Sequence, residues 1–461
     1  MCKMLKRGGI QVKRNWRLAA AAAALTAATL MGCGGQQTGQ GATTAGTTET
    51  KAEETKAAET QAAADSGASE GTLTVAIWDK NQEPGLTEIM KDFTAETGIK
   101  TQIQVTPWEQ YWTMLEAGAT GGSLPDVFWM HSNEIARYSE YEMLLDLTDR
   151  IKSSDKLEMD KFPKDIVGIY NWEGTKQYAV PKDIDTIALW YNKTMFDEAG
   201  ISYPDENWTW DDFAAAAKKL TKADGSQYGF ALRPSNDQAG WNNLVYDMGG
   251  YVISDDKKSS GFNQPGTIKA LTFITDLIKE GYAPPYEVMA ENTEEALFEA
   301  GKVAMVTMGS WMLPELCNND YVKANCNIAV LPKDAETGKR ISIYNGLGWA
   351  AAANTSKPEE AWKLIEYMGS KAAQQKQSDL GVVISAYEGT TSNWIKAYPD
   401  FNLQAYLDMM KDLVIRPYSK STLAWNNMSQ EKLIDAWTGA RSVEDVCNDI
   451  NTEMNALLEQ E

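Results

Sequence analysis

The sequence predicts an α/β protein whose core is divided between two lobes. The chain has 461 residues, of which 43% are hydrophobic and 23% are charged. A chain of this length and composition can bury a core and usually forms more than one domain. From residue 72 onward, strand-like and helix-like hydrophobic periods alternate. Such alternation predicts mostly parallel sheets flanked by helices, with ligands expected beyond the carboxyl ends of the strands.

The first half of this region follows a β-α-β-α-β order. Leu73, Val75 and Ile77 alternate with smaller residues and predict a strand, and the apolar positions from 86 to 93 recur at helical spacing before Gly98. The remaining expected elements are a strand at 101–105, a helix at 112–119 and a strand at 126–130.

A second α/β unit follows. Residues 178–181 and 187–191 are predicted to be strands, and Thr209 with Asp212 forms a capping-box pattern that opens an Ala-rich helix ending at Leu220. Further along, the sequence predicts a helix at 294–300, a buried strand at 303–308, and an amphipathic helix capped by the segment 356–359.

Charge and aromatic content narrow the classes of function. The formal net charge is -21, which disfavours binding to nucleic acid. Sixteen Trp and 19 Tyr accompany a single His, so recognition by flat apolar rings is favoured over imidazole chemistry, and no zinc signature or cofactor motif is present in the sequence. Cys317, Cys326 and Cys447 allow one disulfide at most, with the first two the nearer pair; buried free thiols are the alternative.

The N-terminal segment has the pattern of a lipoprotein signal peptide. Basic residues up to Arg17 precede an apolar stretch that ends at Leu30-Met31-Gly32-Cys33 and resembles the bacterial lipobox. Cleavage after residue 32 would leave a lipidated Cys33 at the extracytoplasmic face of the cell membrane. Residues 33–70, rich in Thr, Ala and Glu, cannot form a core and are expected to be a disordered tether.

Three motifs occur in the order found in one family. These are Leu124-Pro125-Asp126-Val127-Phe128, the segment from Pro181 through Lys193, and Ala300-Gly301-Lys302-Val303-Ala304-Met305 with Gly309-Ser310-Trp311. With them, residues 72–461 resemble the carbohydrate-type extracellular solute-binding proteins of bacterial ABC importers, the group that includes the maltose-binding protein.

That resemblance implies a periplasmic-binding-protein fold with a hinge of several crossings. The N-terminal lobe would comprise 72–182 and 347–392, and the C-terminal lobe 183–346 and 393–461. A monomer of this kind captures a sugar or oligosaccharide between the lobes, closes over it and delivers it to ABC transporter permease subunits served by a separate ATPase. No covalent chemistry is implied.

The resemblance also proposes residues for the ligand site. Trp311 and Trp425 match stacking tryptophans of the family and are expected in loops; Trp241 is a looser match. Trp190, Trp362 and Trp437 fall within apolar periodicity and are assigned to the core. The segment that ends in Trp349 is expected to supply backbone contacts. Polar side-chain contacts are expected from six residues at strand ends and predicted crossings: Asp79, Lys80, Asn81, His131, Asp183 and Asp185.

Alternatives remain for several of these assignments. His131 is equally well explained as an ordinary packed or surface residue, and Asp183 as a partner in a hinge hydrogen bond or ion pair. Asp183 with Asp185 could also serve a lipid-anchored glycoside hydrolase, although two carboxylates on one short strand do not flank a scissile bond. A third hypothesis keeps the binding role but changes the ligand to a polyol, a glycerol-phosphate derivative or a peptide.

Overall fold

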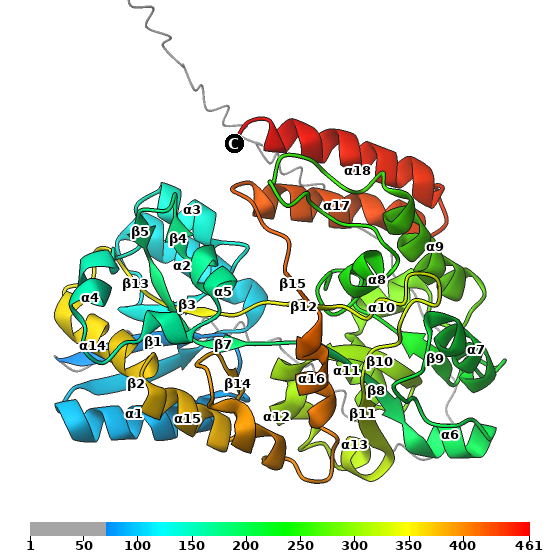
Figure 1. The fold of residues 1–461 in the computed structure, drawn as a ribbon, viewed down its shortest axis with the longest axis horizontal. Coiled ribbons are helices and arrows are strands. Elements are labelled where there is room, and N and C mark those ends of the chain that lie inside the picture. The colour runs from blue at the N-terminus through cyan, green and yellow to red at the C-terminus, as the bar shows by residue number, and fades with distance from the viewer. Residues whose placement is uncertain (1–70) are drawn as a thin grey trace, which may run out of the picture. The chain divides into compact units, whose positions relative to one another are not determined.

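The computed structural model describes residues 71–461, so the predicted signal peptide, Cys33 and the tether lie outside the described residues. Two separate β-sheets organise the described part of the chain (Figure 1). We call the half built on the sheet β2-β1-β3-β13-β6 the first lobe and the half built on β11-β8-β10-β9 the second lobe. Within residues 71–461 no helix combines the length and apolar character that crossing a bilayer requires.

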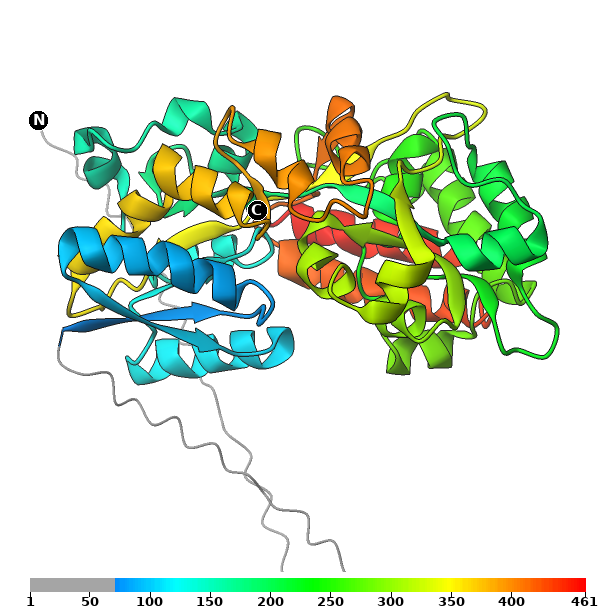
Figure 2. The ribbon, with the colours of Figure 1, turned by 90° about the horizontal axis from the view of Figure 1, so that it is seen from below.

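The first lobe confirms the predicted β-α-β-α-β order. Its sheet is built from β1 (Thr72–Ile77), β2 (Lys100–Val105), β3 (Val127–Met130), β6 (Ala179–Pro181) and β13 (Gly348–Ala351). Helices α1 (Glu83–Thr97), α14 (Pro358–Met368) and α15 (Lys371–Asp379) cover one face, and α2 (Trp108–Gly121) covers the other (Figure 2). Smaller elements are α3 (Ile135–Glu140), α4 (Thr148–Ser153), α5 (Lys164–Ile169), β4 (Asn171–Trp172) and β5 (Lys176–Gln177).

The second lobe is larger and more helical. Its sheet contains β8 (Ile187–Asn192), β9 (Tyr228–Ala231), β10 (Val303–Gly309) and β11 (Cys326–Ala329). The helices around it are α6 (Lys193–Ala199), α7 (Trp210–Leu220), α8 (Asn242–Asp247), α9 (Pro265–Lys279), α10 (Tyr286–Glu291), α11 (Glu294–Glu299), α12 (Leu313–Leu316), α13 (Asp320–Asn325), α16 (Gln404–Asp408), α17 (Thr422–Trp437) and α18 (Val443–Leu458).

Four short strands lie between the two sheets, where the chain passes from one lobe to the other (Figure 1). Strand β7 (Asp183–Ile184) pairs with β14 (Ile384–Ser385), and β12 (Ser342–Tyr344) pairs with β15 (Leu413–Ile415). The chain passes from the first lobe to the second after β6 and returns to the first lobe between β12 and β13. It passes to the second lobe again between β14 and β15. We call these segments the crossings.

The order of crossings explains one wrong expectation, that both sheets are mostly parallel. Strand β1 is parallel to β2 and β3, but β13 is antiparallel to β3 and β6, and in the second sheet only β9 and β10 are parallel. Both β13 and β8 enter their sheets directly from a crossing, so each starts at the edge of its sheet that faces the crossings. Their antiparallel neighbours β3 and β10 therefore end at that edge, and so do β1 and β9, which run parallel to those neighbours.

Local capping follows the predictions in one helix and departs from them in another. Thr209 and Asp212 form both bonds of a capping box at the start of α7, as predicted. Helix α14 begins at Pro358 after Lys357, and no side chain caps it, so the cap predicted within the segment 356–359 is wrong. Proline at the first helical position has no N–H that needs an acceptor, which lowers the need for a capping side chain.

The core assignments are confirmed. Trp190, Trp362 and Trp437 are buried, and Trp190 Nε1 donates a hydrogen bond of 2.8 Å to the Tyr406 hydroxyl. Cys317, Cys326 and Cys447 are buried free thiols, so the candidate disulfide between the first two does not form in this structure.

Candidate functional site

A cluster of indole rings lies where β1 and β3 end and α2 begins. Trp78 follows β1, and its ring centroid lies 5.0 Å from that of Trp108 and 4.9 Å from that of Trp129, both in edge-on contact. Trp112 lies 5.4 Å from Trp108. We call these four residues the Trp cluster; Trp78, Trp108 and Trp112 are partly exposed. Three partly exposed indoles at one strand edge form an apolar surface that suits the C–H face of a ligand.

His131 follows β3 directly and lies beside this cluster, with its ring centroid 5.2 Å from that of Trp108. Its Nδ1 accepts the backbone N–H of Asn133 at 3.1 Å, and its Nε2 lies 3.2 Å from the side-chain amide of Asn345, a residue of the crossing between β12 and β13. Burial and the charge of Arg416 hold the pKa of His131 well below its usual value. The ring is therefore neutral at pH 7.

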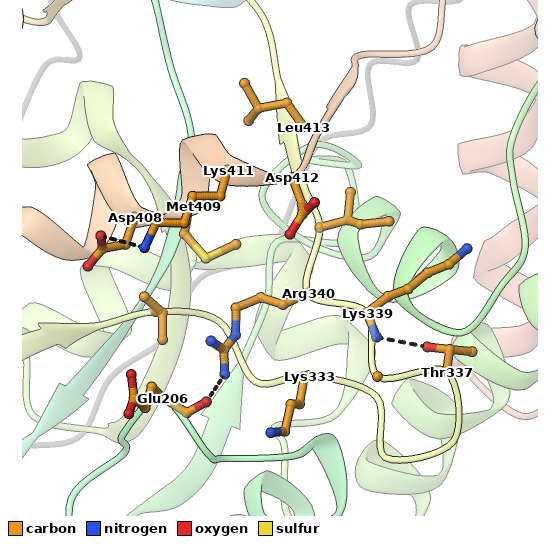
Figure 3. Close-up of a pocket in the computed structure, with 13 residues that line it drawn as sticks. Glu206, Lys333, Thr337, Lys339, Arg340, Asp408, Met409, Lys411, Asp412 and Leu413 are labelled. Carbon is orange, nitrogen blue, oxygen red and sulfur yellow. Dashed lines mark hydrogen bonds and ion pairs between the residues drawn. The ribbon is translucent and has the colours of Figure 1, made fainter.

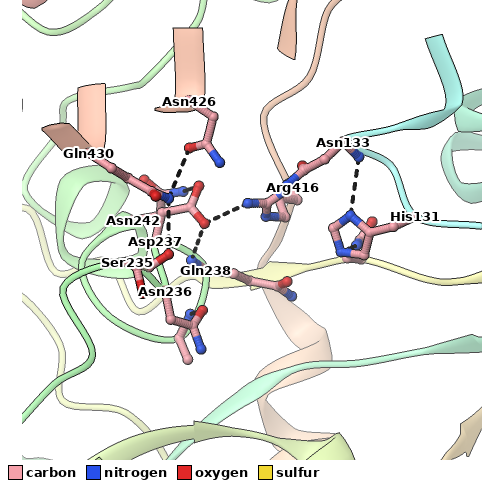
Figure 4. Close-up of polar contacts among 12 residues, drawn as sticks. His131, Asn133, Ser235, Asn236, Asp237, Gln238, Asn242, Arg416, Asn426 and Gln430 are labelled. Atoms are coloured by element: carbon pink, nitrogen blue, oxygen red, sulfur yellow. Dashed lines mark hydrogen bonds and ion pairs between the residues drawn. The ribbon is translucent and has the colours of Figure 1, made fainter. Parts of the chain in front are cut away.

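Arg416, just after β15, connects the two lobes. Its guanidinium donates to the side-chain oxygen of Asn133, which follows β3, and forms a 2.6 Å ion pair with Asp237, which lies between β9 and α8 (Figure 4). Arg416 and Asp237 are both buried. One arginine thus binds a residue from each lobe at the same edge.

Asp185 lies in the same region and ties the crossings together. Its Oδ1 accepts the backbone N–H of Asn345 at 2.9 Å and the side-chain amide of Gln238 at 2.6 Å. Burial, with a further contribution from Asp183, raises the pKa of Asp185 well above its usual value. We call the following set the interlobe network: His131, Asn133, Asp185, Asp237, Gln238, Asn345 and Arg416.

Asp183 has a structural partner, which is one of the two roles foreseen for it. Lys182 is fully buried; its Nζ donates to Asp183 Oδ2 at 2.6 Å and lies 4.4 Å from the ring centroid of Trp129. Asp183 Oδ1 accepts the N–H of Leu347 at 2.8 Å. This buried ion pair fixes the crossing that follows β6.

Asp79, Lys80 and Asn81 lie together at the end of β1, as their sequence requires. Asp79 accepts bonds from the Asn81 N–H at 2.8 Å and from the Gln82 side chain at 2.9 Å, which stabilises the turn into α1. Lys80 is exposed. The Asn81 amide donates to Glu315 Oε2 of α12 at 2.7 Å, a second link between the lobes.

The four predicted tryptophans differ in exposure. Trp311 is partly exposed and follows Gly309 at the end of β10, where its ring packs so closely that a Cβ on Gly309 would come within 2.0 Å of it. Trp425, Trp241 and Trp349 are only 2%, 1% and 0% exposed, so their rings are not available for stacking on a ligand in this structure.

Each buried tryptophan has an evident packing reason. Trp425 lies in helix α17, not in the expected loop, and donates to Ser419 Oγ at 2.9 Å. Trp241 packs against Phe262 with ring centroids 6.0 Å apart. Trp349 lies on β13, between β3 and β6, with its ring centroid 6.1 Å from that of Trp129. The backbone contacts proposed for the segment ending at Trp349 do not depend on its ring.

Several buried polar atoms at the crossing edges have no hydrogen-bond partner among the described residues. They include the hydroxyls of Ser132, after β3, and Ser310, after β10, and the side-chain oxygens of Asn242 and Asn345. Buried hydrogen-bonding groups are nearly always paired in native proteins. These four are therefore candidates for pairing with a ligand or with water.

Glu294, the first residue of α11, was not predicted and is the most unusual carboxyl group near this edge. It is 3% exposed, and its Oε2 has no hydrogen-bond partner among residues 71–461. Burial and the neighbouring Glu295 raise its pKa to about 8, although Arg233, beyond the end of β9, partly counteracts this. No sequence signal identifies it, because alternating Glu and apolar residues also suit an ordinary amphipathic helix.

The raised pKa of Glu294 predicts a pH-dependent stability. Between about pH 4.5 and 8 the unfolded chain is ionised at this residue while the native state keeps the proton, so stability should fall as pH rises through that window, by about 1.4 kcal/mol per pH unit at most. Glu294→Gln should raise the melting temperature at pH 8 and change it little at pH 4.5. Exposed Glu291→Gln on α10 is the control; equal shifts for both variants would contradict the prediction.

Two cavities of the described chain lie away from the predicted site residues. Within the described part of the chain, no group of three or more His, Cys, Asp or Glu side chains is arranged to hold a metal ion. An open cavity of about 700 Å³ lies elsewhere, beside β12 and β15, and is lined by Lys333, Arg340, Asp412 and their neighbours (Figure 3). A second cavity, of about 490 Å³, lies next to α7 and α9.

Two lobes joined by several crossings, with aromatic and polar groups at the facing strand ends, are the features of a two-lobed ligand-binding protein. Residues 79–375 match the family model of the bacterial extracellular solute-binding proteins, and the chain belongs to that family.

Similar proteins of known sequence or structure agree with this class. The galactooligosaccharide-binding protein of Bacillus subtilis is 27% identical over 68% of this chain and 71% of its own length; the maltodextrin-binding protein MdxE of the same organism is 25% identical over 80% and 84%. The solved ABC substrate-binding protein of Listeria monocytogenes, in complex with cycloalternan, covers 84% of this chain and 99% of its own, with a TM-score of 0.77 and 23% identity. Maltose-bound MalE3 of T. maritima covers the same shares, with a TM-score of 0.72 and 21% identity, and these likenesses confirm the two-lobed fold.

Proposed function

We propose that the chain captures a sugar or oligosaccharide between its lobes and delivers it to the permease of an ABC importer. The observation that carries this proposal is the coincidence, at one set of strand ends, of partly exposed indoles with buried polar atoms that lack partners. A sugar offers C–H faces to aromatic rings and a rim of hydroxyls to donors and acceptors, so it satisfies both kinds of group.

Within this proposal, the ligand contacts come from the residues that the structure leaves available. Trp311 and the three partly exposed members of the Trp cluster, Trp78, Trp108 and Trp112, supply stacking surfaces. Asn81, Lys80, Ser132 and Ser310 supply polar contacts. The hydrogen bonds of the interlobe network hold the crossings in place beneath these contacts. We assign Trp425 and Trp241 to packing, because their rings are covered by protein.

The membrane attachment and lobe limits belong to the same proposal. A lipid on Cys33 would keep the binding domain at the extracytoplasmic face of the membrane, and residues 33–70 would give it reach. The described crossings lie close to the proposed lobe boundaries at 182/183 and 346/347. The name of a similar protein and the ligand bound to a similar structure, galactooligosaccharide and maltose respectively, support a carbohydrate ligand.

A glycoside hydrolase is the weaker candidate. The two carboxylates considered for it, Asp183 and Asp185, are each already bonded within the crossings, Asp183 to Lys182 and Asp185 to Asn345 and Gln238. A polyol remains the better non-sugar candidate, because a similar solved structure from Agrobacterium vitis holds D-mannitol. The partly exposed carboxylates Glu299 and Glu315 near this edge disfavour a phosphorylated ligand.

The experiment is a thermal-shift and tryptophan-fluorescence screen of the purified protein against mono- and oligosaccharides, D-mannitol and glycerol 3-phosphate, with chromatography of each mixture. A ligand at a hundredfold excess over Kd stabilises the folded state by about 2.7 kcal/mol. A saturable shift with an intact sugar supports the proposal. Cleavage products would favour the hydrolase. A response to D-mannitol alone, or a response to glycerol 3-phosphate that inorganic phosphate does not reproduce, would replace the sugar as ligand.

A further inference from the structure

The open cavity beside β12 and β15 is lined by cations that form no ion pair within residues 71–461. It is walled by the loop 333–341, by residues 408–413 and by Glu206, and its volume is about 700 Å³. Lys333, Lys339 and Arg340 line it, and none of the three forms an ion pair with another residue of the described chain. In a protein with a net charge of -21, three unpaired cations at one cavity are an unusual concentration.

Arg340 gives the cavity its chemical character. One Nη donates to the backbone carbonyl of Glu206 at 2.5 Å, but the Nε atom is buried and has no hydrogen-bond partner within residues 71–461. Burial lowers the pKa of this guanidinium, and the acidic residues around it, Asp247, Glu206 and Asp205, only partly offset that effect. A buried charged donor without an acceptor is costly, and an oxyanion is the group that relieves the cost best.

The loop that presents Arg340 is well ordered by its own hydrogen bonds. Asp334 Oδ1 accepts the N–H groups of Glu336 and Thr337 at 3.1 and 2.7 Å, and the Asp334 N–H donates to the Lys339 carbonyl at 3.0 Å. Outside the cavity, Lys269 pairs with Asp334 and Glu336. The carboxylates of Asp334 and Glu336 are therefore already bonded. The loop cations Lys333, Lys339 and Arg340 form no ion pair with them and line the cavity.

Three carboxylates also line the cavity and limit where an anion can lie. Asp408 is paired with Lys411 at 3.1 Å, while Asp412 and Glu206 have no ion pair in the described chain. In Figure 3, Arg340 and Lys333 lie at one end of the cavity with Glu206 beside Arg340, and Asp412 with the Asp408–Lys411 pair lies at the other end. An anion is therefore favoured at the Arg340 and Lys333 end, where two cations accompany a single carboxylate and the guanidinium group can donate to a carboxylate or phosphate oxygen.

We propose that this cavity is a second ligand site, distinct from the sugar site, which binds an oxyanion, a phosphate or a carboxylate group, through Arg340 and Lys333. Ile341 leads directly into β12, and Leu413 begins β15, so the walls of the cavity continue into one pair of crossing strands. A bound anion therefore joins the loop to the segment 408–413 and braces that crossing.

The test is a thermal-shift titration of the purified protein with sodium phosphate and, separately, sodium citrate, each replacing sodium chloride at constant ionic strength. We expect a saturable rise in melting temperature with at least one anion. Arg340→Gln should weaken its apparent affinity about tenfold, which corresponds to about 1.4 kcal/mol, in the range of a hydrogen bond to a charged group. A rise in melting temperature with only one of the two anions identifies the oxyanion that the cavity prefers.

Two further variants make the result decisive. Lys333→Gln keeps Arg340 and its bond to Glu206, so it should fold and yet show the same direction of loss. Lys219→Gln, an exposed lysine on α7 away from the cavity, removes the same charge from the same lobe and should titrate like the unaltered protein. The proposal is overturned if no saturable rise occurs, if chloride reproduces it, or if Arg340→Gln and Lys333→Gln respond as the unaltered protein does.

Discussion

Replacing Arg416 by methionine is expected to lower the free energy of unfolding by about 3–5 kcal/mol, because it leaves the buried carboxylate of Asp237 without its counter-ion. The same change removes the bond to Asn133, so both lobes lose a partner at once. Urea unfolding followed by tryptophan fluorescence measures the loss. The double variant Arg416→Met/Asp237→Asn removes the stranded charge and should recover part of the stability.

Lys420→Gln provides the matched control. Lys420 lies four residues further along the same segment and forms an exposed ion pair of 2.8 Å with Glu173. Exposed pairs contribute roughly 0–1 kcal/mol, so this variant should unfold almost as the unaltered protein does. If Arg416→Met and Lys420→Gln cost the same, the buried pair is not the link between lobes that its geometry indicates.

The second large effect concerns ligand affinity. Trp311→Ala should weaken binding of whichever sugar the screen identifies by about thirtyfold, since truncation of a tryptophan anchor typically costs about 2 kcal/mol or more. The ring is partly exposed at the end of β10 and held in place by its contact with Gly309. Isothermal titration of the variant and the unaltered protein measures the difference, and Trp311→Phe should retain part of the affinity.

Trp437→Phe separates a loss of stacking from a loss of stability. Trp437 is buried at the end of α17 and is not among the proposed ligand contacts. Its replacement should lower the melting temperature with little change in Kd. An unchanged Kd in Trp311→Ala, with weaker binding in Trp108→Ala, would move the stacking surface from the second lobe to the Trp cluster of the first.

The elements that sequence predicted well depend on contacts within a few residues. Alternation in 73–77 and helical spacing in 86–93 describe which side of a short segment is apolar, and the capping box of α7 joins residues only three apart. The direction of β13 depends instead on a crossing from the other lobe. No local pattern around Trp349 contains that information, which is why mostly parallel sheets were expected.

The same distinction explains the site. Asn426 and Asn427 made a loop around Trp425 plausible, but both lie inside α17, where packing between helices overrides their weak helix propensity. Arg416 and Asp237 are 179 residues apart in the chain, and their pairing has no signature in the sequence. The Trp cluster, by contrast, could have been found, because Trp78 directly follows the first predicted strand and Trp108 comes shortly after the second.

The position of β13 in the first sheet determines which lobe can be completed first during synthesis of the chain. Within the described sheet, β6 is hydrogen-bonded to β13 alone, and β13 lies between it and β3, although residues 348–351 are synthesised long after residue 181. A nascent chain that carries β1, β2, β3 and β6 still lacks the strand that joins β6 to the other three. Bringing β6 and β13 together closes the long chain segment between them, which costs conformational entropy. Hydrogen bonds between the two strands offset this cost only after they have formed. The first lobe, although it begins the described chain, is thus completed only after most of the second lobe has been made.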